Sequence, residues 1–196
     1  EVAIKELEAA GYKRAGFETY VLPGDPIDEA MKNKEAVYNS LGVQKGAATN
    51  FIAIGSSAKS SLGMDYYAQN YYSLNLYKEC LNKGNLPIYR GTKLTKDDKI
   101  RRYLVNVIRT YFQVDYSDFK KRFDVNFKEY FSDQINFLKE HEKDGLVKIF
   151  DDKIQITDVG ENFAPQIANV FDKYDPPTSS YSKRLDKIKK VSSIPS

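Results

Sequence analysis

The sequence predicts an α/β segment followed by a winged-helix-like helical domain. Helix and strand patterns alternate over residues 1–84, which include the continuous apolar run Phe51–Ile54. Such a run is typical of a strand buried on both faces, as in a parallel sheet or barrel. Residues 85–175 are then patterned as helices around one hairpin, formed by Leu146–Phe150 and Lys153–Thr157. We therefore expect two domains of different architecture.

The first part begins with a helix that Gly11 ends, and its last helix ends before Gly84. Pro23-Gly24-Asp25-Pro26 predicts a turn between a strand and the helix that follows it. The expected elements are helices over residues 2–10, 27–38 and 65–81, and a strand over residues 12–22. Two strands cannot close a barrel, so we expect the rest of the sheet to precede Glu1.

The second part contains a strong helix start at Thr95, with Asp98 at the capping-box position and Asp97 in the first turn. A 3.6-residue period of apolar side chains follows in this helix and in two later ones. The three predicted apolar faces are Ile100, Leu104, Val107, Ile108 and Tyr111; Phe127, Phe131, Ile135 and Leu138; and Phe163, Ile167, Val170, Phe171 and Tyr174. Residues 176–196 are rich in Ser, Pro and Lys, so we expect a flexible basic tail.

Composition excludes several classes of protein. The chain has 196 residues, a net charge of +3 and a single cysteine, Cys80, which we expect to be a packed thiol. One cysteine excludes an intrachain disulfide and any metal site built from several cysteines. His141 is the only histidine and lies among charged residues, which predicts an exposed side chain rather than a ligand. No apolar run is long enough for a membrane span, so we expect a cytoplasmic protein.

A nucleic-acid-binding winged helix is the competing interpretation of the second part. In that fold the helix before the wing reads the DNA, and here it would be residues 126–143, with a net charge of −1. The predicted wing tip is Asp151-Asp152, which is also acidic. Because phosphate neutralisation supplies most of the affinity for DNA, these charges favour a protein-docking module or a substrate-covering lid over a DNA reader.

An ordered set of short motifs covers nearly the whole chain before the tail. The set is Ala10-Gly11-Tyr12, Leu22-Pro23 with Asp25, Gly55 with Ser57-Ala58, Tyr67-Ala68-Gln69-Asn70, Tyr89-Arg90-Gly91, Leu94-Thr95 with Asp97-Asp98, Ile100-Arg101-Arg102, Phe112 with Asp115-Tyr116, Asp144-Gly145-Leu146-Val147, and Thr157 with Gly160. In this order and spacing, the motifs resemble the C-terminal part of the oxygen-independent coproporphyrinogen III oxidases, which are radical S-adenosylmethionine enzymes of haem biosynthesis.

The resemblance implies a partial (β/α) barrel whose N-terminal Cys-x3-Cys-x2-Cys loop holds a [4Fe–4S] cluster. That cluster cleaves S-adenosylmethionine, and the resulting radical converts propionate side chains of coproporphyrinogen III to vinyl groups with loss of CO2. One cysteine cannot hold the cluster, so this chain would be the end of the barrel plus the C-terminal domain, inert and without cofactor by itself. The implied partners are the N-terminal barrel portion of the same parent chain, a tetrapyrrole or related substrate and an external electron donor, with no nucleic acid and no membrane.

Two departures from the oxidase pattern leave the substrate open. Residues 37–45 keep Asn39 and Gly42 at substrate-side positions, but lack the histidine, glutamine and tyrosine of the oxidases. After Gly55, the resemblance places an aliphatic residue of the S-adenosylmethionine pocket where this chain has Lys59. A cation there would suit an anionic ligand, and an exposed loop lysine is the alternative. The parent would then be an oxidase, a relative with another substrate or a haem chaperone.

Three arginines are further candidates for binding propionates or phosphates. Arg101, Arg102 and Arg109 lie along the helix that starts after Thr95. Guanidinium groups bind such anions in a bidentate manner. The alternative is that one of them pairs with Asp97 or Asp98, or fixes the helical domain to the barrel.

Overall fold

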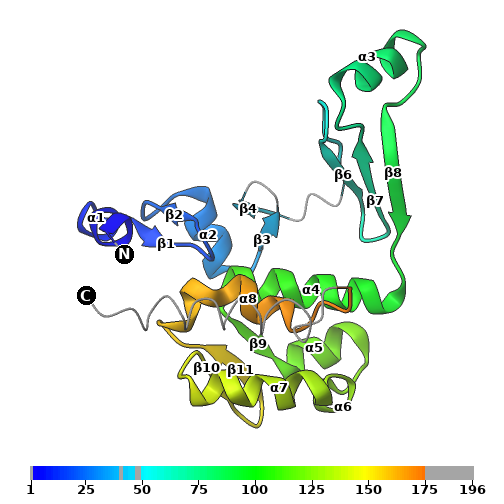
Figure 1. Cartoon of the computed structure of the whole chain (residues 1–196). Coiled ribbons are helices and arrows are strands. Elements are labelled where there is room, and N and C mark those ends of the chain that lie inside the picture. The colour runs from blue at the N-terminus through cyan, green and yellow to red at the C-terminus, as the bar shows by residue number, and fades with distance from the viewer. Residues whose placement is uncertain (1, 40–41, 47–49, 175–196) are drawn as a thin grey trace, which may run out of the picture. The chain divides into compact units, whose positions relative to one another are not determined.

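A computed structural model describes residues 2–39, 42–46 and 50–174 (Figure 1). These residues form two compact units. The first contains the described residues up to 46 together with residues 103–174, and the second contains residues 50–102. The domain limits expected from the sequence, 1–84 and 85–175, stay a prediction, and the expected tail lies outside the described residues.

The N-terminal part of the first unit consists of short elements. In order these are α1 (Val2–Ala9), β1 (Lys13–Arg14), β2 (Tyr20–Val21), α2 (Pro26–Lys32), β3 (Ala36–Asn39) and β4 (Gly42–Lys45). The strands β1 and β2 pair antiparallel, as do β3 and β4. The helix α2 packs on β3 and β4 around the buried side chains of Ala30, Ala36 and Val43.

Two sequence predictions are wrong in this region. The strand expected over residues 12–22 is instead the pair of two-residue strands β1 and β2. The helix expected over residues 27–38 ends at Lys32, because Asn33 caps it and Lys34 turns the backbone to a φ of +57°. Residues 36–39 then pair with β4, and the hydrogen bonds of this pairing replace those of a continued helix.

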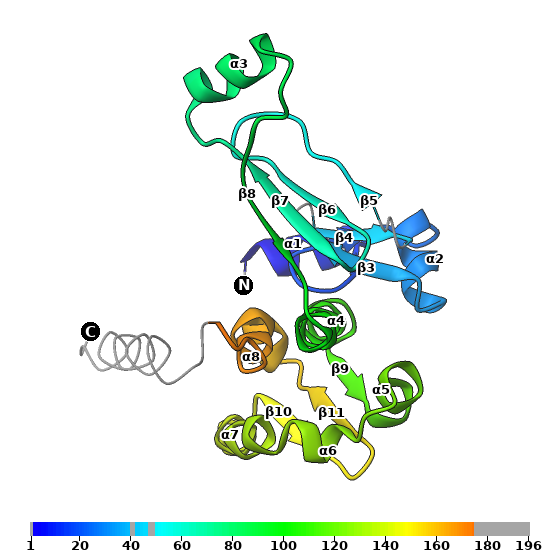
Figure 2. The same cartoon turned by 90° about the vertical axis from the view of Figure 1, so that its right-hand side faces the viewer.

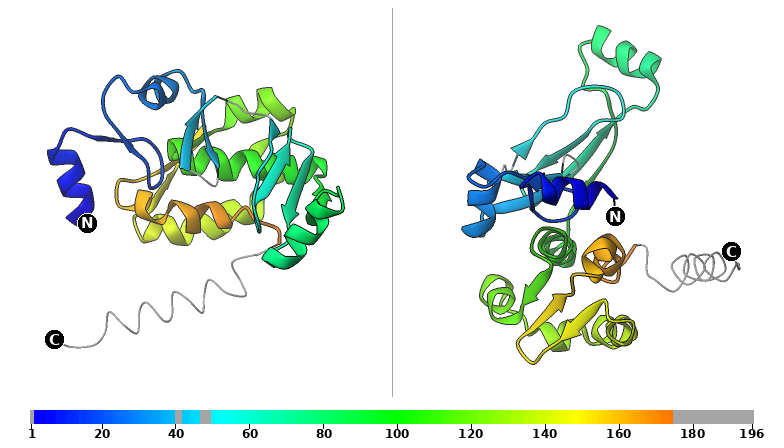
Figure 3. Two further views of the ribbon diagram at one scale, coloured as in Figure 1. Left: turned by 90° about the horizontal axis from the view of Figure 1, so that it is seen from above. Right: turned by 90° about the vertical axis from the view of Figure 1, so that its left-hand side faces the viewer.

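The remainder of the first unit is mostly helical. Its elements, which begin with a helix shared with the second unit, are α4 (Lys96–Tyr111), β9 (Gln113–Asp115), α5 (Tyr116–Phe123), α6 (Phe127–Tyr130), α7 (Ser132–Lys143), β10 (Val147–Ile149), β11 (Lys153–Ile156), a 3₁₀ turn (Gly160–Phe163) and α8 (Ala164–Asn169). The strands form a sheet in the order β10-β11-β9. The predicted hairpin around Asp151-Asp152 is confirmed, and β10 lies against α7 (Figures 2 and 3).

Aromatic rings fill the core of this helical part. The side chains of Phe119, Phe127, Phe131 and Phe171 are fully buried, and the ring centroids of Phe127 and Phe131 lie 5.2 Å apart. The apolar faces predicted for the first two helices point inward, since Ile100, Leu104 and Ile108 are buried, as are Phe127, Phe131 and Leu138. The third prediction is correct only in part, because α8 ends at Asn169 and the side chains of Phe163 and Tyr174 are 39 % and 77 % exposed. The second predicted helix is interrupted, however, because Phe131 has φ −115° and ψ 31° and separates α6 from α7.

The second unit is an antiparallel sheet with one helix. It comprises β5 (Asn50–Phe51), β6 (Lys59–Leu62), β7 (Tyr66–Asn70), α3 (Leu74–Asn82) and β8 (Ile88–Lys93). Strand order is β5-β6-β7-β8, and each neighbouring pair is antiparallel (Figure 2). The N-terminal end of α4 also belongs to this unit.

Three predictions for the second unit are wrong. The described strands pair antiparallel, not parallel. The run Phe51–Ile54 contributes only its first residue to a strand, and Ile52 and Ile54 are 75 % and 90 % exposed within the described chain. The helix expected over residues 65–81 starts only at Leu74, where Ser73 caps it, because residues 66–70 are held as a strand between β6 and β8. Across the described residues, no helix is long and apolar enough to cross a membrane.

Candidate functional site

The turn that contains Gly55 is held in place by side chains of β7. The Asn70 side-chain amide donates hydrogen bonds to the carbonyl oxygens of Gly55 (2.9 Å) and Ala53 (3.3 Å). Next to it, the Gln69 amide donates to the Ser57 carbonyl at 3.0 Å. Gly55 has φ +114°, a conformation that favours glycine. Asn70 and Gln69 are both buried, so their hydrogen bonds fix this turn from the interior side.

Lys59 follows this turn as the first residue of β6, and its side chain is exposed. It pairs across the sheet with Gln69, which in turn pairs with Arg90 of β8. The Gln69 side-chain oxygen accepts hydrogen bonds from the Arg90 Nε–H (3.0 Å) and from the Tyr72 hydroxyl (2.9 Å). Arg90 also donates through Nη2 to the Tyr72 oxygen at 3.2 Å. The predicted residues Gly55 and Lys59 thus share one short segment, which the side chains of Gln69 and Asn70 hold by hydrogen bonds. The sequence places both of these residues in a motif but did not predict this role.

Asn39 and Gly42, the predicted substrate-side positions, lie in the first unit. They are paired residues at the connection between β3 and β4. Gly42 has φ +91°, and a Cβ atom there would come 3.0 Å from the Thr19 hydroxyl oxygen. That hydroxyl also accepts a hydrogen bond from the Val43 N–H at 3.2 Å. Gly42 therefore has a structural role in this hairpin whatever the hairpin binds.

The three candidate arginines are engaged within their own units. The Arg101 Nε–H contacts both carboxylate oxygens of Asp97, at 2.9 and 3.0 Å, as the ion-pair alternative predicted. Arg102 donates to the Gly63 carbonyl at 3.1 Å, and its guanidinium lies 4.6 Å from the centroid of the Tyr67 ring. In the first unit, the guanidinium of Arg109 lies 5.3 Å from the centroid of a tyrosine ring of β3.

His141 does not have the exposed position that the sequence predicted. It is only 5 % exposed, and its ring centroid lies 5.3 Å from that of Phe137. The reason is helical spacing: His141 follows Phe137 by four residues and Leu138 by three, so it shares the face of α7 that packs inward. Burial lowers the pKa of its imidazole below the ordinary value of 6.5.

A [4Fe–4S] cluster does not fit the residues of this chain. Cys80 lies partly buried on α3 as a free thiol, and it is the single cysteine of the sequence. Within the described ranges, no group of three or more His, Cys, Asp or Glu side chains is placed to hold a metal ion. Cluster binding requires cysteine thiolates in a number that the sequence does not supply.

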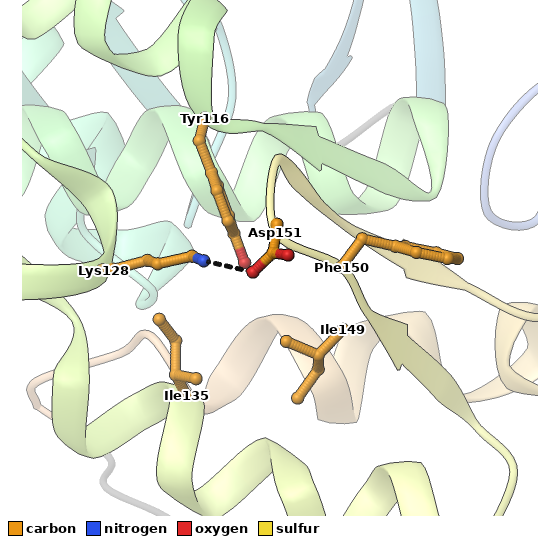
Figure 4. A pocket seen from close by; sticks show the side chains of 6 residues that line it. All are labelled: Tyr116, Lys128, Ile135, Ile149, Phe150 and Asp151. Carbon is orange, nitrogen blue, oxygen red and sulfur yellow. Dashed lines mark hydrogen bonds and ion pairs between the residues drawn. The ribbon is translucent and has the colours of Figure 1, made fainter.

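A hollow of about 440 Å³ in the first unit is a weaker candidate (Figure 4). It lies between α6, α7 and the tip of the β10–β11 hairpin and is lined by Tyr116, Lys128, Ile135, Ile149, Phe150 and Asp151. An ion pair of 3.1 Å joins Lys128 to Asp151 beside the Tyr116 hydroxyl (Figure 4). Burial and the neighbouring carboxylates of Asp152 and Asp151 raise the pKa of Tyr116 to about 12. The tyrosine therefore stays protonated and cannot act as a general base near neutral pH.

The sequence of this chain is similar to those of known proteins. Residues 94–160 match the family model described as the HemN C-terminal domain. The oxygen-independent coproporphyrinogen III oxidase of Pseudomonas aeruginosa is 30 % identical over 172 residues, and that of Escherichia coli is 32 % identical over 168 residues. These alignments cover 88 % and 86 % of this chain, but 37 % and 36 % of the two relatives. The chain thus spans a little over a third of their length.

A solved structure agrees with these sequence matches. It is described as coproporphyrinogen III oxidase (HemN) from Escherichia coli, a radical SAM enzyme. The match has a TM-score of 0.82 at 31 % sequence identity and covers 88 % of this chain and 40 % of that one. The mixed α/β content expected from the sequence is shown by this likeness. The chain is therefore homologous to the C-terminal part of the oxygen-independent coproporphyrinogen III oxidases.

Proposed function

We propose that this chain forms the C-terminal part of a radical S-adenosylmethionine enzyme that decarboxylates propionate side chains of a coproporphyrinogen-like tetrapyrrole. The observation that carries the proposal is the structural likeness to the Escherichia coli enzyme over 88 % of this chain. In this proposal residues 1–84 complete a partial barrel, and residues 85–175, which include α4 to α8, form a winged-helix-like domain that covers the substrate. The [4Fe–4S] cluster would be supplied by an N-terminal barrel portion, because this chain has one cysteine.

Exposed apolar side chains on the second unit support an N-terminal barrel portion as the partner. Ile52, Ile54 and Leu86 are 75 %, 90 % and 78 % exposed within the described chain. Isolated exposed apolar residues are common, but several on one small sheet unit favour a covered surface. We assign that covering to the N-terminal barrel portion, and the external electron donor to the cluster that it would hold. A cytoplasmic location stays a prediction.

Within the parent, Gly55 and Lys59 would line the S-adenosylmethionine pocket, and Asn39 and Gly42 would lie on the substrate side. Lys59 favours a second candidate, a relative that acts on a different anionic substrate or carries haem. An aliphatic side chain cannot pair with a carboxylate, whereas the exposed ammonium of Lys59 can. A non-catalytic interaction module is the third candidate. The acidic tip of the β10–β11 hairpin fits protein contact better than DNA contact.

The proposal is tested with the full-length parent protein. We expect the coding sequence before Glu1 to encode a Cys-x3-Cys-x2-Cys loop, and the reconstituted protein to cleave S-adenosylmethionine under anaerobic conditions. Conversion of coproporphyrinogen III to the divinyl product, followed by chromatography, separates the oxidase from its relatives. Absence of the cysteine loop would overturn the radical-enzyme proposal. If Lys59 redirects the substrate, Lys59→Ile should raise the conversion of coproporphyrinogen III, and an unchanged rate would contradict that role.

A further inference from the structure

The register of the sheet in the second unit places two cations on either side of a buried glutamine. Lys59, Gln69 and Arg90 are directly paired across β6, β7 and β8, which lie side by side (Figure 2). Side chains of residues directly opposite each other in antiparallel strands point to the same face. Neighbouring strands lie about 4.8 Å apart, so the Cα atoms of the two cationic residues are separated by about 10 Å. The exposed side chain of Lys59 can therefore reach a group that is bound at Arg90.

The Arg90 guanidinium is positioned by two hydrogen bonds, yet its charge is not neutralised. Its guanidinium has two acceptors, the oxygens of Gln69 and Tyr72. Both acceptors are uncharged, and a guanidinium carries five N–H donors, which leaves three for another partner. Among the described residues, neither Lys59 nor Arg90 forms an ion pair. A preorganised guanidinium loses less conformational entropy when it binds an anion.

The carboxylates of the second unit are committed to other groups. Asp65 pairs with Lys99, Glu79 pairs with Lys83, and Asp97 pairs with Arg101. Asp98 accepts hydrogen bonds from the backbone and hydroxyl of its capping residue. Further along the same face, Arg102 stacks over Tyr67, which is two residues before Gln69 in β7. The face therefore carries positive charges along its length, and the carboxylates of the second unit are paired with groups other than Lys59 and Arg90.

We propose that the face formed by Lys59, Gln69 and Arg90 is a binding site for the carboxylate or phosphate group of a small anionic molecule. Arg90 supplies the forked donor, Lys59 supplies a second positive charge, and Gln69 fixes the guanidinium through its side-chain oxygen. This site belongs to the chain itself. Only its assignment to a ligand of the radical reaction rests on the proposed function.

The test is binding of glutarate and of inorganic phosphate to the 196-residue chain, at constant ionic strength. Chemical shifts of the Gln69 side-chain amide and the Arg90 Nε–H report occupancy directly. We expect saturable shifts in the millimolar range, with affinity about 10-fold weaker in Arg90→Gln and weaker also in Lys59→Ile, since each removes a charge-assisted contact. Lys78→Gln is the matched control, because Lys78 is an exposed lysine of α3 in the same unit, and it should bind like the wild type.

The outcomes separate this inference from the proposed function. Binding of either anion that depends on Arg90 and Lys59 supports the site, and the anion that binds more tightly identifies the carboxylate or phosphate source. Equal losses in all three variants would mean a general charge effect and would overturn it, as would absence of saturable shifts with both anions. These results stand even if the parent lacks a cysteine loop, which would remove the proposed function alone. Circular dichroism of each variant verifies that the fold is retained.

Discussion

Replacement of Asn70 by leucine should loosen the turn that carries Gly55 and Lys59. The Asn70 amide makes two hydrogen bonds to backbone carbonyls, of 2.9 and 3.3 Å, and the residue is 7 % exposed. Each such bond contributes about 1 kcal/mol net. Loss of both should therefore lower the local stability of the turn by about 2 kcal/mol, which corresponds to roughly a 30-fold increase in local opening.

Amide hydrogen exchange measures this opening directly. The Ser57 N–H donates to the Tyr71 carbonyl at 2.8 Å, and the Asn70 N–H donates to the Ala58 carbonyl at 3.0 Å. Both amides should exchange about 30-fold faster in Asn70→Leu, because opening of the turn exposes them. The amide of Ile156 in the first unit, which donates to a carbonyl at 2.7 Å, should not change.

The matched control is Asn75→Leu, which makes the same substitution at an exposed position of α3. It should leave exchange of the Ser57 amide as in the wild type. Unchanged exchange of that amide in Asn70→Leu would refute the reasoning, because the two side-chain hydrogen bonds would then not hold the turn. Equal acceleration in both asparagine variants would refute it as well.

Three further perturbations test the helical part and its cap. Burial lowers the pKa of His141, so the unfolded chain binds the proton first as pH falls through 6.5. The free energy of unfolding should therefore decrease below that pH. In urea titrations, His141→Gln should remove this pH dependence. Gly160→Ala would place a Cβ atom well inside van der Waals contact with the Leu146 carbonyl oxygen, so it should cost about 3 kcal/mol of stability, measured by thermal unfolding. Thr95→Val removes the hydroxyl that exchanges hydrogen bonds with Asp98, so it should lower stability by about 1 kcal/mol in urea.

Each of these expectations has an outcome that contradicts it. For His141, the pH dependence of the variant would equal that of the wild type. For Gly160→Ala, a wild-type midpoint would mean that the backbone near Leu146 moves aside at little cost. Thr92→Val is the control for the cap, because Thr92 is an exposed threonine of β8. This control variant should have the same free energy of unfolding as the wild type. An equal loss in both threonine variants would contradict the capping argument.

Local chemistry explains which sequence predictions were confirmed. The start of α4 rests on Thr95 and Asp98, which are three residues apart and hydrogen-bond each other in the structure. The β10–β11 hairpin rests on two alternating segments around one turn. Such features need only neighbours in sequence. The predictions that were wrong concern features that depend on contacts between distant segments. Residues 66–70 resemble part of a helix in isolation, but the strands on both sides hold them extended.

The candidate site follows the same division. Gly55 and Lys59 could be singled out from the sequence, because they stand near each other and one departs from the pattern that the chain resembles. Gln69 and Arg90 belong to motifs in the sequence, but their place beside Lys59 could not be predicted, because they are separated from it by up to 31 positions and meet it only through strand register. His141 shows the same limit, because its charged neighbours in sequence suggested exposure and only packing of α7 buries it.

The sequence by itself determined the helix cap, the apolar faces of the first two predicted helices, the hairpin and the absence of enough cysteines for a cluster. These depend on residue type and on spacings within one or two turns. Only the tertiary structure decided that the strands of the second unit pair antiparallel, and that Lys59, Gln69 and Arg90 lie in one row. The physical reason is that strand register is set by hydrogen bonds between distant segments, and a shift by one residue would send each of these side chains to the other face of the sheet.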